Sequence, residues 1–425
     1  MDQLKRQLHL PGAIVIGLGS ILGTGVFVSL AFAAGIVQNA QALLFACVIG
    51  GIVAGLNGLS SAQLAAAHPV AGGTYEYGYK FLHPLAGYIA GITFLLAKTA
   101  SAAAAALSFA AYLLSALNGP QHTLAHITIA ASAVILLTAL TLLGIKRTNT
   151  LNAVIVTCTV LGLLAFITVA LTIDPTQGMV SIGRPTIDAH TLAFASAIVF
   201  VAYTGYGRIA TMGEEVVNPR RTIPRAVVIT LFIAMALYLG VAYAATQAVG
   251  VTNFGLITGG ATSPLANIVR DVPWAFWLVS LAAITAMLGV LLNLILGLSR
   301  VLLAMGRRGD APAATARLNA DRTTPFIAVI VMGAAILAVV FTGNAKAAWQ
   351  FSALTVLVYY ALTNLAALRV PAHQRFIPRI ISWAGLVSCL ALAVFIPWQT
   401  WVIGGTMLAA ACLYRVLWRR ATRST

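Results

Sequence analysis

The chain has 425 residues, of which 60% are hydrophobic and only 8% are charged. Soluble domains carry about 25% charged residues, so 9 acidic and 25 basic side chains cannot cover the surface of a soluble protein of this length. Long continuous apolar runs also exclude a transmembrane β-barrel, whose strands alternate apolar and polar residues. The composition therefore predicts an all-α membrane protein with many spans.

Twelve apolar runs, separated by polar or Pro/Gly-rich residues, approach the length of about 20 residues that crosses a membrane. We expect them to form one transmembrane domain over residues 1–425. In chain order they are 12–37, 41–67, 84–118, 125–145, 150–173, 190–213, 225–249, 273–305, 324–342, 347–369, 377–396 and 399–418. The aromatic-rich segment 72–84, GGTYEYGYKFLHP, predicts a short helix at the membrane surface.

The positions of the basic residues predict the orientation of the chain in the membrane. Twenty of the 25 would lie on the side of both termini, and only Arg184, Arg270 and Lys346 on the other side. Basic residues gather in cytoplasmic loops, so both termini are expected in the cytoplasm, with the protein in the inner or plasma membrane. The net charge of +16 is thus explained without a nucleic-acid partner. The remaining two bases, Lys98 and Arg208, fall inside runs.

The run 12–37 carries four glycines in the string IGLGSILGTGVF, at positions 17, 19, 23 and 25. Close packing against another membrane helix explains Gly19 and Gly23, which are four residues apart. It explains the adjacent Gly23-Thr24-Gly25 less well, because glycines two apart face different directions. A break in the helix is the alternative, and its unpaired amides and carbonyls could hold a carboxylate and an amine.

A matching feature lies in the run 190–213, where FVAYTGYGRIATMGEE places Gly205 and Gly207 in mid-span. The first and sixth runs would correspond in an inverted repeat of two five-helix units. Paired glycine-interrupted spans are a sequence pointer to a transporter's binding site, so the pairing favours a substrate site. The expected units are 12–173 and 190–369, followed by two accessory helices in 377–418.

Four strings also resemble the amino-acid permeases of the APC superfamily, which transports amino acids, polyamines and organocations. They are GSILGTGVF, PVAGGTYEY (69–77), GYGRIATMGEEVVNPRRTIPR (205–225) and LSRVLLAMGRRGDAP (298–312). The resemblance covers about residues 10–370 and is closest to the cationic-amino-acid and prokaryotic broad-specificity branches. It implies a LeuT-like fold, with a five-plus-five inverted repeat and two further helices.

The resemblance also implies a set of site residues. The segment around Ser20, Ile21, Gly23, Thr24 and Gly25 would bind the carboxylate and part of the amine of the substrate. The amine site and side-chain pocket would be completed by Val201, Tyr203, Thr204 and Gly205. Since Val201 stands where some relatives have a gating tryptophan, that role falls to Phe200 or Tyr203. The residues expected to act in gating or coupling are Lys98, Phe200, Tyr206 and Arg208.

Two positions depart from the pattern of the relatives. Some proton-coupled relatives carry a lysine in the fifth helix, but VIVTCTVLGLL (154–164) has none and Thr159 takes that place. The cationic branch often has an acid two residues after the glycine of the sixth helix, where this chain has Gly207. Neither the usual route of proton coupling nor a preference for cationic substrates follows from the resemblance.

Lys98 lies midway along the run 84–118 between small and apolar residues. A lysine at that depth is costly unless it faces the protein interior. It could snorkel to the surface, donate to carbonyls at the helix breaks, exchange a proton during transport or hold the substrate carboxylate. At the end of the sixth run, Glu214 or Glu215 could pair with Lys5 or Arg6 as an inner gate, or belong to a solvated loop.

These observations predict a secondary transporter that moves amino acids by alternating access, as a proton symporter, exchanger or exporter. All nine acids lie in loops or at run ends, which favours neutral or broad specificity over the alternative of a cationic amino acid or polyamine. A channel and a membrane enzyme are the other classes, but no catalytic constellation is visible. No metal or cofactor is expected; the partners would be the amino acid, the membrane lipid and, as a candidate, protons.

Overall fold

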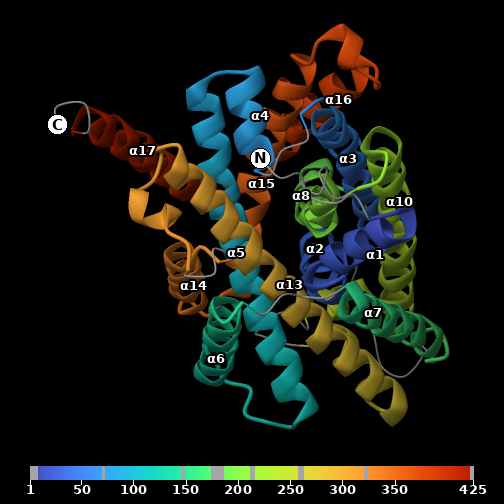
Figure 1. Ribbon diagram of the computed structural model, residues 1–425. Coiled ribbons are helices and arrows are strands. Elements are labelled where there is room, and N and C mark those ends of the chain that lie inside the picture. Colours follow the sequence, from blue (N-terminus) through green and yellow to red (C-terminus); the bar gives the residue numbers. More distant parts are fainter. Residues whose placement is uncertain are drawn as a thin grey trace.

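The computed structural model describes residues 8–68, 72–144, 149–173, 186–210, 216–256, 263–319 and 324–421. These residues form helices, together with one isolated β-bridge between Leu8 and Val216. Figure 1 shows the helices gathered around two long inclined ones, α5 and α13. The principal helices are α1 (Leu10–Ile21), α2 (Leu30–Val37), α3 (Ala40–Ala67), α4 (Thr74–Phe81), α5 (Pro84–Ala116), α6 (Thr123–Leu142), α7 (Asn149–Ala170), α8 (Ala189–Tyr203), α10 (Pro219–Val249), α13 (Pro273–Arg307), α14 (Phe326–Val340), α15 (Ala345–Leu368), α16 (Arg379–Val394) and α17 (Trp398–Ala421).

Several short helical segments complete the described part of the chain. They are η1 (Gly25–Ser29), η2 (Thr204–Tyr206), α9 (Gly207–Ala210), α11 (Val251–Leu256), α12 (Pro264–Ile268), η3 (Ala313–Ala316) and η4 (Ala372–Gln374). The predicted surface helix in 72–84 is α4. It begins after Gly73, whose φ of 58° is a conformation that favours glycine.

Within the described residues, nine helices are long and apolar enough to cross a membrane, and the bent pair Leu10–Ile21 and Gly25–Val37 makes a tenth. The all-α, multi-span prediction is confirmed at this level. Helices α14 and α16 lie in the ninth and eleventh predicted runs but have only 15 and 16 residues. At 1.5 Å per residue they extend about 22–24 Å, less than the hydrocarbon thickness of about 30 Å.

The predicted break in the first run is confirmed. Helix α1 ends at Ile21, Leu22 is extended with φ −77° and ψ 100°, and the chain resumes with the π-helical turn η1. The two parts are bent by 40°. The glycines on either side of Thr24 explain why continuous helix is weak here, since each glycine costs about 1 kcal/mol in a helix interior.

An equivalent break was predicted in the sixth run, 190–213, but the helix stays closed there. Helix α8 passes through the single 3-10 turn η2 directly into α9, so the helix tightens without opening. The amide of Thr204 donates to the carbonyl of Val201, and its hydroxyl donates to the same carbonyl. These local bonds keep the chain helical, and glycine alone does not open it.

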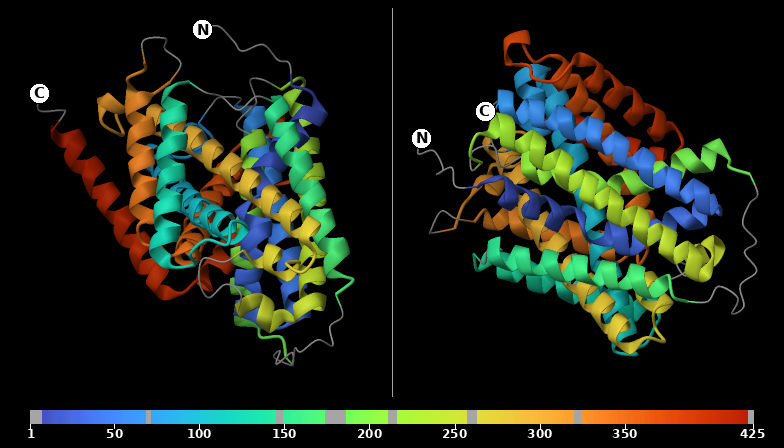
Figure 2. Two further views of the ribbon diagram at one scale, coloured as in Figure 1. Left: turned by 90° about the horizontal axis from the view of Figure 1, so that it is seen from below. Right: turned by 90° about the vertical axis from the view of Figure 1, so that its right-hand side faces the viewer.

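The packing of the long helices places both glycine-marked segments at the centre of the bundle. Helix α5 packs on α13 and α15, α3 packs on α8 and α10, and α1 packs on α10 and η2. Helix α17 lies at the edge, as Figure 1 and the left view of Figure 2 show. Helix α10 begins at Pro219, six residues before the predicted run, because proline suits the first helical position.

Candidate functional site

A cavity of about 1110 Å³ runs from the break after α1 to the start of α4 and the C-terminal end of α13. Its inner part is lined by residues of the break, α5, α8, η2 and α15. At the other end it is lined by Glu76, Arg300, Arg307 and Arg308. Because the side chains of Arg307 and Arg308 are exposed, the cavity opens at this end. The predicted residues that line it are Ser20, Ile21, Gly23, Thr24, Gly25, Lys98, Val201, Thr204, Gly205 and Arg208.

Polar groups of the break belong to residues that line the cavity. The Thr24 hydroxyl is buried and has no hydrogen-bond partner among the described residues. Among the described residues, the Gly23 amide has no backbone acceptor, whereas the Gly23 carbonyl accepts from the amides of Val26 and Phe27. The Ser20 hydroxyl is already used, since it donates to the carbonyl of Ile16. The break therefore offers two donors, one amide and one hydroxyl, to a bound anion.

The glycines near the break allow close packing as well. A Cβ atom on Gly205 would collide with the backbone carbonyl of Ser20. A Cβ on Gly25 would lie 2.6 Å from the Cβ of Ala202. The packing considered for Gly19 and Gly23 is also present, since a Cβ on Gly19 would collide with the Asn152 side chain and one on Gly23 with that of Val290. Close packing and the break after α1 therefore coexist. Gly25 packs against α8, so a larger side chain at this position would clash with α8 before it reached a ligand in the cavity.

Lys98 connects α5 to the turn η2. Its Nζ atom donates to Thr204 Oγ1 at 3.0 Å, and Thr204 Oγ1 donates to the carbonyl of Val201 at 2.8 Å. The lysine side chain is partly buried and lines the cavity. It points inward from the middle of α5, so it does not snorkel to the membrane surface.

The structure does not bring the three predicted aromatic residues of the sixth run to the cavity. Phe200, Tyr203 and Tyr206 are fully buried and are absent from its lining. The Tyr203 hydroxyl donates to the carbonyl of Cys47 on α3, and its ring packs on Tyr238 of α10 at 4.7 Å between centroids. These rings hold α8 against α3, α10 and α15.

Other aromatic residues, which the sequence motifs did not single out, line the cavity instead. They are Phe94, Trp349, Tyr359 and Tyr360. The Trp349 indole donates to the carbonyl of Ile198 at 3.0 Å, so α15 is fixed against α8. The only sequence signal for these residues was a pair of adjacent tyrosines inside an otherwise apolar run.

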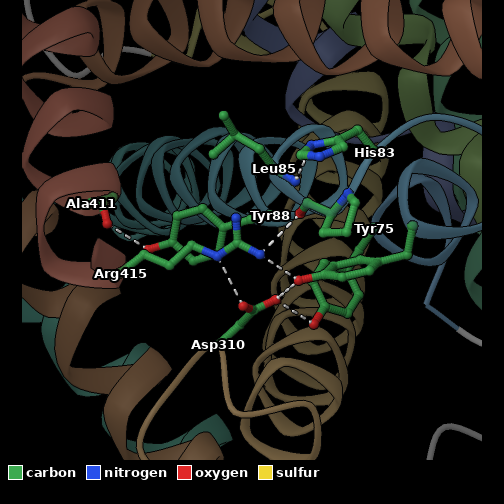
Figure 3. A network of polar contacts seen from close by, with 9 residues as sticks. Tyr75, His83, Leu85, Tyr88, Asp310, Ala411 and Arg415 are labelled. Carbon is green, nitrogen blue, oxygen red and sulfur yellow. Dashed lines mark hydrogen bonds and ion pairs between the residues drawn. The ribbon is translucent and has the colours of Figure 1, made fainter. Parts of the chain in front are cut away.

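The open end of the cavity is held together by α4, α13 and α17. Arg308 forms an ion pair with Glu76 and lies 4.1 Å from the centroid of the Tyr79 ring. Beside it, the buried Asp310 carboxylate is 3.1 Å from Arg415 Nε of α17, as Figure 3 shows. The Tyr75 hydroxyl donates to the same carboxylate at 3.0 Å. Burial and the Asp310 charge raise the pKa of Tyr75, so it stays a donor.

The four residues predicted to form an inner gate lie outside the described residues. They are Lys5, Arg6, Glu214 and Glu215. The chain flanking them is described: the amide of Val217 donates to the carbonyl of Leu8 at 3.0 Å. Leu8, just before α1, therefore lies beside Val216 and Val217, just before α10.

A bundle of membrane helices in which one helix breaks beside an internal cavity is the arrangement of a membrane transporter. The chain belongs to the amino acid permease family, whose sequence pattern matches residues 12–423. It is 38% identical to an uncharacterized transporter of Mycobacterium tuberculosis, over 100% of this chain and 94% of that one.

Two other relatives have named substrates. The chain is 25% identical to the branched-chain amino acid permease of Bacillus subtilis, over 93% of this chain and 89% of that one. It is 29% identical to the mitochondrial cationic amino acid transporter 3 of Arabidopsis thaliana, over 79% of this chain and 58% of that one. The resemblance drawn from the four strings is confirmed: the protein is a multi-pass transporter of this family and not an enzyme.

Proposed function

We propose that the protein carries amino acids across the membrane by alternating access and binds them at the break after α1. The observation that carries the proposal is Thr24, a cavity-lining residue whose buried hydroxyl has no partner among the described residues and follows the Gly23 amide, which has no backbone acceptor among them. A buried polar group without a partner costs about 1–3 kcal/mol. A substrate carboxylate at this point would remove that cost, and carbonyls at the break and η2 would take the amine.

The family implies a LeuT-like fold, and we extend this to twelve spans. In this proposal the segments 12–173 and 190–369 are the two five-helix repeats, and 377–418 forms the accessory pair. Both termini lie in the cytoplasm and the protein lies in the inner or plasma membrane, an orientation supported by the distribution of basic residues.

Neutral or broad specificity is supported by the charges around the cavity. Among the described lining residues, the sole acid is Glu76, and Arg308 already pairs with it. A cationic side chain in the inner part of the cavity would therefore face Lys98 with no carboxylate to balance it. The named relatives transport branched-chain and cationic amino acids respectively, so a cationic amino acid or polyamine is the alternative.

A carrier is favoured over a channel because the cavity ends inside the protein. None of its described lining residues belongs to α2, α11 or α12. Helices α2 and α11 pack together, since Gly35 of α2 contacts Gly255 of α11. The Tyr112 hydroxyl of α5 donates to the carbonyl of Phe27 in η1 and accepts from the amide of Leu265 in α12. A channel would need a path lined from one side to the other.

Purified protein in liposomes tests the proposal. Uptake of the standard amino acids would be measured with and without a pH gradient, and again with unlabelled amino acid inside the vesicles. We expect at least one amino acid to enter faster when the vesicles are preloaded, as in a carrier. Dependence on the pH gradient would separate a proton symporter from an exchanger or exporter. Transport with no acceleration by internal substrate would contradict alternating access.

A further inference from the structure

Lys98 is a charged group in the middle of a membrane helix whose neighbours on both sides are small or apolar. Arg308 pairs with Glu76 and Arg415 with Asp310, and Lys98 has no ion-pair partner among the described residues. An unpaired charge at this depth costs several kcal/mol. Packing alone therefore does not explain a lysine at position 98.

The link to Thr204 satisfies only part of the ammonium group. A lysine ammonium has three N–H donors, and the structure gives Lys98 one acceptor among the described residues, the Thr204 hydroxyl oxygen. That acceptor is neutral, and its own proton is donated to the carbonyl of Val201. Two donors and the full positive charge therefore remain available to the cavity that Lys98 lines.

The position of Thr204 brings this charge beside the broken helix. The next residue, Gly205, packs so closely on Ser20 that no Cβ would fit between them. Lys98 thus contacts the turn that touches the end of α1, and the break at Gly23 and Thr24 follows directly along the chain. Gly23, Thr24 and Lys98 all line the cavity, and their amide, hydroxyl and ammonium groups have donors that no described residue takes up.

We propose that Lys98 is the counter-charge for the carboxylate of the bound amino acid. The site then takes substrates with a free carboxylate and rejects amino-acid amides and decarboxylated amines, which bring a positive charge to Lys98 with nothing to balance it. This inference rests on the proposed function and names the group that the site selects. It gives Lys98 a role in specificity that the link to Thr204 alone would not require.

The test measures how strongly the site prefers a carboxylate. The standard amino acids are screened for binding to purified wild-type protein, and the tightest is paired with its primary amide, for example leucine with leucinamide. The two affinities are then measured for Lys98→Met, which keeps an apolar stem, and for Lys98→Gln, which keeps a donor for Thr204. Lys98→Arg keeps the charge, and Arg300→Met removes another positive charge from the same cavity.

We expect the ratio of acid to amide affinity to fall at least about tenfold in Lys98→Met and Lys98→Gln, the size of a charge-assisted hydrogen bond. The affinity for the amide should stay equal or rise, because a repulsive charge is gone. Lys98→Arg should keep most of the preference, and Arg300→Met should keep it within about threefold, because its charge is nearer the solvent.

Three results would overturn the inference. A wild-type protein that binds the acid and the amide equally has no carboxylate selection. Equal weakening of both ligands in Lys98→Met and Lys98→Gln would leave Lys98 a structural link between α5 and η2. If the wild type binds none of the amino acids, the proposed function fails first and this inference fails with it. Thermal unfolding of each variant identifies a loss of fold separately.

Discussion

Two threonines at the glycine-marked segments use their hydroxyl groups in opposite ways. Thr204 accepts from Lys98 and donates to Val201, so its hydroxyl is fully occupied inside the protein. Thr24 has no partner for its hydroxyl although the atom is buried. The sequence patterns singled out both residues equally. The structure distinguishes them, because the Thr204 hydroxyl contacts Lys98 and the Thr24 hydroxyl has no partner among the described residues.

Replacing Thr24 by valine tests that difference. Valine keeps the shape and removes the hydroxyl, so amino-acid binding should weaken about tenfold while thermal stability stays equal or rises, because an unsatisfied polar group is lost. Thr230→Val is the matched control: its hydroxyl is also buried and unpartnered but does not line the cavity. It should change neither binding nor transport. Equal binding losses in both variants would argue against a ligand at Thr24.

A second pair of substitutions compares a glycine that is tightly packed with a glycine that has space around it. Gly205→Ala should lower the unfolding midpoint, because its Cβ meets the Ser20 backbone carbonyl, which cannot rotate away. Overpacking of this kind costs about 1–3 kcal/mol. Gly297→Ala on α13 meets nothing within 4 Å and should be neutral or stabilising, since alanine favours a helix. Equal midpoints for both variants would mean that α1 can move away from η2.

At the scale of elements, α17 is attached to the rest of the molecule at the open end of the cavity. Arg415 contributes an ion pair to Asp310 and donates to the carbonyl of Pro84 at the start of α5. Its guanidinium carbon also lies 4.7 Å from the centroid of the Tyr88 ring. One side chain thereby joins α17 to α5 and to the end of α13, next to the α4 residues that border the cavity.

The Arg415→Met variant should destabilise the protein strongly, by about 3–5 kcal/mol, because it leaves the buried Asp310 carboxylate without its counter-charge. The double variant Arg415→Met with Asp310→Asn should recover part of that loss. Thermal unfolding of wild type, both single variants and the double variant measures the coupling. If the losses simply add, the pair is not coupled and another contact holds α17.

The sequence predicted elements better than the orientation of individual side chains. Among the described residues, apolar runs and glycines located the nine long apolar helices and the break after α1, because span length and helix propensity are local properties. Which face of α8 meets the cavity is not local. Since the helix is apolar all round, no periodic pattern shows that Val201 faces the cavity while Tyr203 faces α10. The partners of α8 decide this, and they come from distant segments.

The whole molecule is open at one end and closed at the other. The cavity reaches the surface near α4 and the end of α13, while α2, α11 and α12 close the opposite side. The open end carries Arg307, Arg308 and the Asp310 network, and by the distribution of basic residues we assign it to the cytoplasm. With this proposed orientation, the structure would correspond to the inward-facing state of the proposed alternating-access cycle.

Labelling of single cysteines tests this orientation in the intact protein. Ala304 lines the cavity on α13, and Thr342 is exposed after α14, in a loop predicted on the outer side. In a background with the partly exposed Cys158 and Cys412 changed to alanine, a membrane-impermeant maleimide should label Ala304→Cys in inside-out vesicles only. It should label Thr342→Cys in intact cells only, because that loop faces outward. Labelling of Ala304→Cys from outside only would reverse the orientation, and rapid labelling from both sides would favour a continuous pore over a carrier.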